Sequence, residues 1–134
     1  MCIYVYKENR KTDFLIASQA ITMKLFTEEL EKINKKFEPA SRIKNSSSLE
    51  FAAEQASQTQ EWKKQLAYLL RAIIVDHAFD DGNKRTGAYL IFKFFEANGF
   101  PADMQKVNKL VIKIASESIT DLEKLRRQIH DATI

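Results

Sequence analysis

The chain has 134 residues, which is enough for one hydrophobic core and too short for two ordinary domains. Hydrophobic residues make up 45% of it, and only three glycines and two prolines punctuate it, so the composition predicts an all-α fold. The net charge of +3 comes from cations spread along the sequence, which does not indicate direct nucleic-acid binding.

Cysteine content and the length of the apolar runs indicate the cellular compartment of the protein. A lone cysteine, Cys2, excludes a disulfide framework and a cysteine-based metal site. The longest strongly apolar run, residues 89–95, is far shorter than the roughly 20 residues that span a bilayer, and the first residues lack the pattern of a secretory signal. We therefore expect a cytoplasmic protein with no membrane association.

The first predicted elements precede residue 49. Residues 3–6 are β-prone and predict a short strand or ordered coil. Thr12 and Asp13 are candidate N-caps of a helix that reaches about residue 36. Its apolar face is predicted from residues at helical spacing: Phe26, Leu30, Ile33 and Phe37. Residues 38–48 contain a proline and a run of asparagine and serine, which compete for backbone hydrogen bonds, so we expect an exposed loop or flap.

Further helices are predicted after this flap. They span about residues 49–57, 60–78 and 83–98, and then begin near Asp103 and Asp121. The helix over 60–78 carries an apolar stripe that ends at His77. The helix over 83–98 is apolar on nearly all sides, which predicts a place in the middle of a bundle. The helix from Asp103 divides into inward apolar residues and outward lysines: Met104, Val107, Leu110, Val111 and Ile114 against Lys106, Lys109 and Lys113.

Residues 77–87, with the sequence HAFDDGNKRTG, form the most informative segment. A glycine that leads into a helix leaves free backbone N–H groups at the positive end of the helix dipole, and Gly82 and Asn83 occupy that entrance. Lys84 and Arg85 in the first turn oppose the dipole unless an anion offsets them. Their position therefore favours a polyanion such as a di- or triphosphate.

Acidic and basic side chains in the same segment suggest group transfer. Polyphosphates are usually handled with Mg²⁺, which takes one or two carboxylates together with phosphate oxygens and water. Asp81, and less so Asp80, can supply the carboxylate. His77 can take a proton from a hydroxyl near neutral pH. The set favours phosphoryl or nucleotidyl transfer to a hydroxyl group.

This segment resembles the signature of the Fic/DOC family, His-x-Phe-x-Asp/Glu-Gly-Asn-x-Arg, and every fixed position is filled. The resemblance implies a compact Fic-type bundle of about six to seven helices, with the signature loop between two central helices. It also implies a single domain over residues 1–134. Its core would span about residues 49–134, and residues 1–48 would add an N-terminal helix and a target-docking flap.

The resemblance implies a role for each position of the signature. His77 would deprotonate the target hydroxyl, and Phe79 would pack inward to hold the loop. Asp81 would bind Mg²⁺, while Gly82 and Asn83 would line the anion hole for the nucleotide, which is ATP or another nucleoside triphosphate.

The next cations distinguish two branches of the family. Arg85 would hold a nucleotide phosphate. Nucleotidyl-transferring members typically carry a glycine where this chain has Lys84, and a second arginine where it has Ala88. Both departures resemble the Doc-like branch, a protein kinase that moves the terminal phosphate of the nucleotide to a Ser or Thr hydroxyl. Lys84 would stabilise charge on the transferring phosphate, so Lys84 and Arg85 join His77 as predicted catalytic residues.

The resemblance also implies partners. Family members often carry an inhibitory motif, Ser/Thr-x-x-x-Glu-Gly/Asn, and no segment here matches it: Glu50 is followed by Phe51, and Glu31 by Lys32. Restraint would then come from a separate antitoxin protein, as in Doc-like toxin–antitoxin pairs. The protein substrate would be a component of translation, such as a translation factor.

Each part of the signature also has a purely structural explanation. A lone His77 at the end of an apolar stripe is more often a buried histidine bonded to a backbone carbonyl. Asp80 and Asp81 could cap the following helix, and Lys84 and Arg85 could pair with them at the surface. Only the combination favours catalysis.

Two other functions also fit the sequence. A Fic-type enzyme would transfer AMP or another nucleotide to a protein hydroxyl. A non-catalytic nucleotide-binding module would bind nucleotide equally well after His77→Ala.

Overall fold

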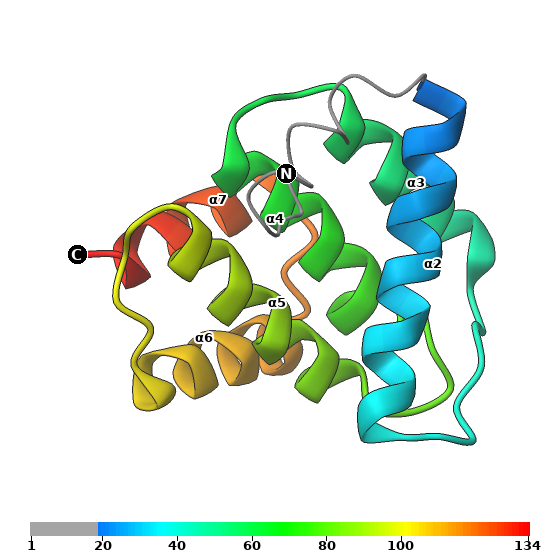
Figure 1. The fold of residues 1–134 in the computed structure, drawn as a ribbon. Coiled ribbons are helices and arrows are strands. Elements are labelled where there is room, and N and C mark those ends of the chain that lie inside the picture. Colours follow the sequence, from blue (N-terminus) through cyan, green and yellow to red (C-terminus); the bar gives the residue numbers. More distant parts are fainter. Residues whose placement is uncertain (1–18) are drawn as a thin grey trace.

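The structure, a computed structural model, describes residues 19–134, with side chains from residue 27 onward. Within this range the chain forms an all-α bundle, which confirms the predicted fold class (Figure 1). The signature loop, residues 76–82, connects η1 to α5. The helices before it are α2 (Gln19–Phe37), α3 (Ser46–Ser57), α4 (Trp62–Leu70) and one turn of π-helix, η1 (Arg71–Val75). Those after it are α5 (Asn83–Ala97), α6 (Met104–Glu117) and α7 (Leu122–Ala132). The predicted strand at residues 3–6, the N-caps Thr12 and Asp13 and the side chain of Phe26 lie outside the described residues.

Helix α5 occupies the centre of the bundle, as predicted from its apolar sequence. It packs against α2, α4, η1 and α6, and in Figure 1 it runs between α2 and α6. Its buried residues are Thr86, Gly87, Leu90, Ile91, Phe94 and Phe95. Because α5 follows the signature loop directly, this burial fixes the position of its first turn.

Helices α6 and α7 begin at the predicted aspartates. The Asp103 side chain accepts a hydrogen bond from the Gln105 N–H, and Asp121 accepts bonds from Glu123 and Lys124. The inward residues of α6 are buried as predicted, with one exception. Met104 is 55% exposed because it is the first residue of the helix, one turn before the buried Val107.

Helix α3 begins three residues earlier than its sequence suggests, at Ser46. The reason is Asn45, whose side-chain oxygen accepts a hydrogen bond from the Ser48 N–H (3.2 Å). This cap places the serine run in the first helical turn, where the sequence predicted an exposed loop. The predicted flap is therefore shorter than residues 38–48.

The helix predicted over residues 60–78 ends before its last turn. After α4 the chain widens into η1, where the Asp76 N–H donates to the Arg71 carbonyl (3.0 Å) and the Ala78 N–H to the Ala72 carbonyl (3.1 Å). Such π turns shift the helical register and are frequent at functional sites. His77 consequently lies outside the helix. No helix among the described residues is long and apolar enough to cross a membrane.

Candidate active site

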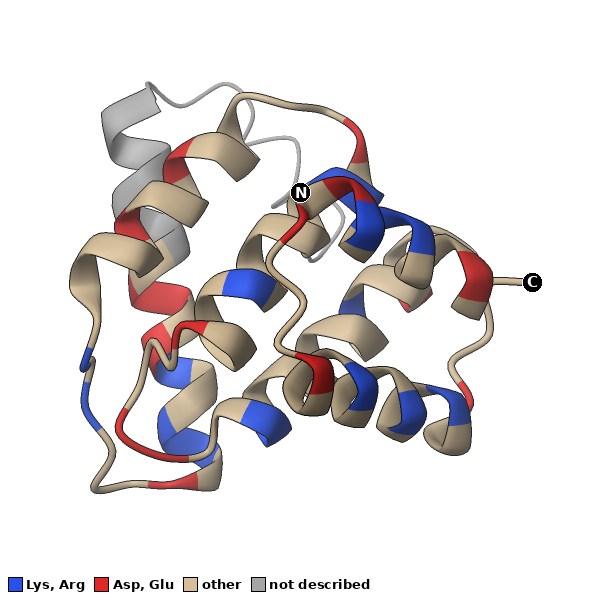
Figure 2. Ribbon diagram, turned by 180° about the vertical axis from the view of Figure 1, so that it is seen from behind, with Lys and Arg blue, Asp and Glu red and all other residues tan. Residues whose placement is uncertain are grey.

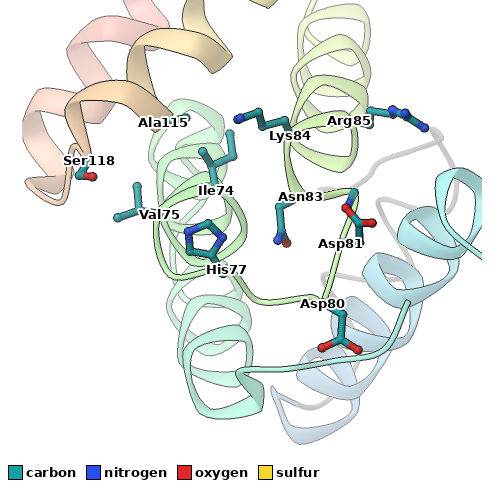
Figure 3. A pocket seen from close by; sticks show the side chains of 11 residues that line it. Ile74, Val75, His77, Asp80, Asp81, Asn83, Lys84, Arg85, Ala115 and Ser118 are labelled. Carbon is teal, nitrogen blue, oxygen red and sulfur yellow. The ribbon is translucent and has the colours of Figure 1, made fainter. Parts of the chain in front are cut away.

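The predicted site residues converge on one open cavity of about 380 Å³ (Figure 3). Its walls come from the end of η1, the signature loop, the first turn of α5 and the C-terminal end of α6. The lining residues are Ile74, Val75, His77, Asp80, Asp81, Gly82, Asn83, Lys84, Arg85, Ala115 and Ser118. All the predicted site residues except Phe79 therefore line the same space.

His77 is an exposed residue in an uncommon backbone conformation. Its φ is +52°, in the left-handed region, where histidine is found more often than most residues. This conformation turns the chain out of η1, and the imidazole lies between Val75 and Asn83 in the cavity wall (Figure 3). Because the ring is exposed, the alternative of a buried structural histidine is wrong.

Phe79 and Asn83 hold the signature loop in shape. Phe79 is fully buried in the core, as expected for an anchor. The Asn83 side chain accepts a hydrogen bond from the Phe79 N–H (3.1 Å) and donates one to the Phe79 carbonyl (2.9 Å). The side-chain amide of Asn83 is thus committed to the loop, and what this residue can offer an anion is its backbone N–H.

Gly82 is the N-cap residue of α5, and its position leaves little room for a side chain. Its φ is +72°, and a Cβ there would lie 3.0 Å from Glu38 Cγ and 3.2 Å from Asn34 Nδ2. As the N-cap residue it has no side chain with which to cap the helix. The first backbone N–H groups of α5 have no partner within the helix, and they begin at the cavity. An anion placed there would meet the positive end of the α5 dipole.

The neighbouring carboxylates face different surroundings. Asp81 Oδ1 accepts a hydrogen bond from the Gly82 N–H (2.8 Å), so this carboxylate is held beside the start of α5. Asp80 lies farther back along the loop (Figure 3). Neither side chain caps the first turn of α5, whose N-cap is Gly82, and the structural alternative for the aspartates is not supported.

The carboxylates at the cavity decide how the predicted Mg²⁺ could be held. Among the residues that the structure describes, no group of three or more Asp, Glu, His or Cys residues could hold a metal ion. A single carboxylate at the cavity fits Mg²⁺ only when phosphate oxygens and water complete its shell. Asp81 therefore suits a metal that arrives with a nucleotide.

The two cations of the first turn point in different directions. Lys84 is exposed and extends over the cavity toward Ala115 (Figure 3), and within the described part of the chain it forms no ion pair. Arg85 extends in the direction opposite to Lys84 (Figure 3), and its Nη1 lies 3.5 Å from Glu38 Oε2. The alternative in which these cations pair with Asp80 and Asp81 is therefore wrong.

The flap, residues 38–45, lies along the signature loop. The Lys44 N–H donates to the Ala78 carbonyl (2.7 Å), the Asp80 N–H donates to the Arg42 carbonyl (2.9 Å), and Ile43 and Phe79 form an isolated antiparallel bridge. In Figure 2 the acidic stretch of the loop lies between the flap and the basic start of α5. The flap is thus part of the site's framework.

Two buried polar residues outside the signature also contact the loop, and sequence reasoning missed both. The Asn34 amide donates to the Asp81 carbonyl (2.8 Å), and the Ser41 hydroxyl donates to the same carbonyl (3.1 Å). Asn34 had a recognisable signal, because it is a polar residue within the apolar stripe formed by Leu30, Ile33 and Phe37. Ser41 had none.

A histidine, a carboxylate and the N-terminus of α5 share one open cavity, and residues of these types can together serve group transfer. A model of the Fic/DOC family matches residues 10–95, well over half of the chain, and the chain belongs to this family. As a member it is a Fic-type transferase that modifies protein hydroxyl groups, and nucleoside triphosphates are the typical donors in the family. No curated protein and no solved structure matches the sequence.

Proposed function

We propose that this protein is a Doc-like kinase, which transfers the γ-phosphate of a nucleoside triphosphate to a Ser or Thr hydroxyl of a target protein. The observation that carries the proposal is Lys84. It occupies the position where nucleotidyl-transferring members typically have glycine, and its exposed ammonium group extends over the cavity. A cation there can stabilise charge on the phosphate in transit.

In the proposed reaction, each polar group of the cavity has one role. The target hydroxyl approaches His77, which takes its proton as the hydroxyl oxygen attacks the γ-phosphorus. The bond from the γ-phosphorus to the bridging oxygen breaks, and the nucleoside diphosphate leaves with the electron pair. The backbone N–H groups at the start of α5 and the side chains of Lys84 and Arg85 stabilise the phosphate charge.

Asp81 would hold Mg²⁺ together with phosphate oxygens, and the metal would neutralise part of the phosphate charge. The Gly82 N–H bond to Asp81 Oδ1 keeps the carboxylate close to the helix N-terminus that receives the phosphates. The start of α5 would therefore lie beside both the nucleotide phosphates and the Mg²⁺ that accompanies them.

The proposed setting is a toxin–antitoxin pair in the cytoplasm. The target would be a component of translation, and a separate antitoxin would restrain the enzyme. An exposed His77 in an open cavity supports restraint by a separate protein, because nothing in the described part of the chain covers the proposed base.

Transfer from labelled ATP tests the proposal. The purified protein is incubated with cell extract, Mg²⁺ and ATP labelled with ³²P at either the γ- or the α-phosphate. We expect a protein band labelled from the γ-phosphate only, lost in His77→Ala and retained in His130→Ala. His130 is a suitable control because it is the only other histidine in the chain and lies on α7, exposed and 2.7 Å from Lys63 Nζ.

Label from the α-phosphate would move the protein to the nucleotidyl transferases. Absence of label from both positions, with nucleotide binding retained in His77→Ala, would support a non-catalytic nucleotide-binding module.

A further inference from the structure

We propose that Asn34 and Ser41 are positioning residues of the active site, which orient the Asp81 carboxylate through its own main chain. Neither residue lies in the signature, and both come from the segment before α3. The inference rests on the proposed role of Asp81 at the nucleotide phosphates.

Asn34 joins α2 to the last residue of the signature loop and to α5. It is fully buried, and its Nδ2 donates to the Asp81 carbonyl (2.8 Å) and to Thr86 Oγ1 (3.2 Å). Asp81 is the last loop residue before Gly82, and Thr86 lies one turn into α5. A single amide group therefore sets the position of the loop relative to the helix that receives the phosphates.

Ser41 binds both main-chain polar groups of Asp81. It is only 3% exposed, and its hydroxyl donates to the Asp81 carbonyl (3.1 Å) and accepts from the Asp81 N–H (3.2 Å). The Lys35 ammonium donates to the Ser41 carbonyl (2.8 Å), which ties this part of the flap to α2. The backbone of Asp81 is thus held from outside the signature at every polar atom.

These contacts reach the carboxylate through one planar peptide group. The Asp81 carbonyl and the Gly82 N–H belong to the same peptide bond, so fixing the carbonyl fixes the direction of the N–H. That N–H is the group that binds Asp81 Oδ1. By fixing this peptide group, Asn34 and Ser41 therefore orient the Asp81 carboxylate.

The unpaired oxygen of Asn34 argues against a role in packing alone. Among the described residues, Asn34 Oδ1 is buried and has no hydrogen-bond partner. A buried acceptor without a partner is unfavourable, so packing alone does not call for an amide at this position. The donor half of the amide, which holds Asp81, is what requires asparagine.

The test compares Asn34→Leu with a matched control, Gln65→Leu. Gln65 is also a buried amide, 4% exposed, and it donates to the backbone carbonyls of Ala56 and Thr59 away from the cavity. We expect Asn34→Leu and Ser41→Ala to raise the Mg²⁺ concentration for half-maximal γ-phosphate transfer by about tenfold, a typical loss for residues that orient a metal ligand. At saturating Mg²⁺ the rate should return to near the wild-type value, and Gln65→Leu should leave the Mg²⁺ dependence unchanged.

Hydrogen–deuterium exchange gives a readout without nucleotide or activity. In the folded protein alone, Asn34→Leu and Ser41→Ala should speed exchange of the amides at residues 80–82, and Gln65→Leu should not. Unchanged exchange and unchanged Mg²⁺ dependence in Ser41→Ala would overturn the inference, even if Asn34→Leu failed to fold. If the wild-type protein transfers no label, the proposed function fails, whereas the exchange result still decides whether these residues hold the loop.

Discussion

Arg85 already has a charged partner before any nucleotide arrives. Its Nη1 lies 3.5 Å from Glu38 Oε2, and the two side chains are 65% and 36% exposed. An exposed pair of this kind contributes only about 0–1 kcal/mol because water screens the charges. A phosphate at the start of α5 can therefore displace Glu38 from Arg85.

This competition predicts the effect of Glu38→Gln. Removing the carboxylate should lower the KM for ATP by at most about fivefold, which corresponds to roughly 1 kcal/mol, and should leave kcat unchanged. Steady-state transfer of the γ-phosphate over a range of ATP concentrations measures both constants. Glu96→Gln, which removes a similar exposed pair with Lys93 at the far end of α5, serves as the control. A loss of kcat in Glu38→Gln would show that the carboxylate acts in the reaction and does not merely compete with the nucleotide.

At the same scale, the sequence predicted the signature residues that line the cavity and missed the other lining residues and those that support the loop. The signature is contiguous, so its histidine, carboxylate, glycine and cations could be recognised together. Asn34, Glu38 and Ser41 reach the loop across 40 or more residues of sequence, and only the fold brings them there. Local patterns carry no information on such pairings.

Among the elements, the contact between α5 and η1 sets the geometry of the cavity. A Cβ on Gly87 would lie 2.7 Å from Ile74 Cδ1, closer than real Cβ atoms approach other atoms. Ile74 lines the cavity, and Lys84 stands one turn before Gly87 on the same helix. This close approach holds the end of η1, and with it His77, against the start of α5.

We therefore expect Gly87→Ala to lower the free energy of unfolding by at most about 2 kcal/mol, because overpacking costs roughly 1–3 kcal/mol and the better helix propensity of alanine offsets about 1 kcal/mol of it. Urea unfolding followed by circular dichroism measures this change. Ile74→Val removes the Cδ1 atom that would clash, so the double variant should be less destabilised than the sum of the single variants. Additive effects would show that the contact with Ile74 is not the cause.

The element boundaries show where periodicity alone was insufficient. Helix α5 was predicted almost to the residue because its apolar sequence and its flanking glycines are both local signals. The end of α4 was not, because apolar spacing continues through η1 while the backbone changes to a π turn and then to the left-handed His77. The start of α3 depended on the cap that Asn45 provides, which reverses the usual effect of a serine run.

In the whole molecule, segments before and after the signature support the cavity, whose lining residues come from the stretch between Ile74 and Ser118. Leu30 and Ile33 of α2 belong to the same hydrophobic core as α5, so the segment before residue 49 supports the site directly. At the other end, Ala115 and Ser118 form a wall of the cavity, although they lie beyond residues 10–95 that the family model matches. The signature thus defines the chemistry, and the rest of the bundle shapes the space around it.

Identification of the transferred group on the target tests the central claim most directly. The protein is incubated with cell extract, unlabelled ATP and Mg²⁺, and the modified peptides are identified by mass spectrometry, with His77→Ala and His130→Ala in parallel. The account predicts a phosphoryl group on a Ser or Thr residue, present with wild type and His130→Ala and absent with His77→Ala. An adenylyl group on that hydroxyl, or phosphorylation that persists in His77→Ala, would contradict it.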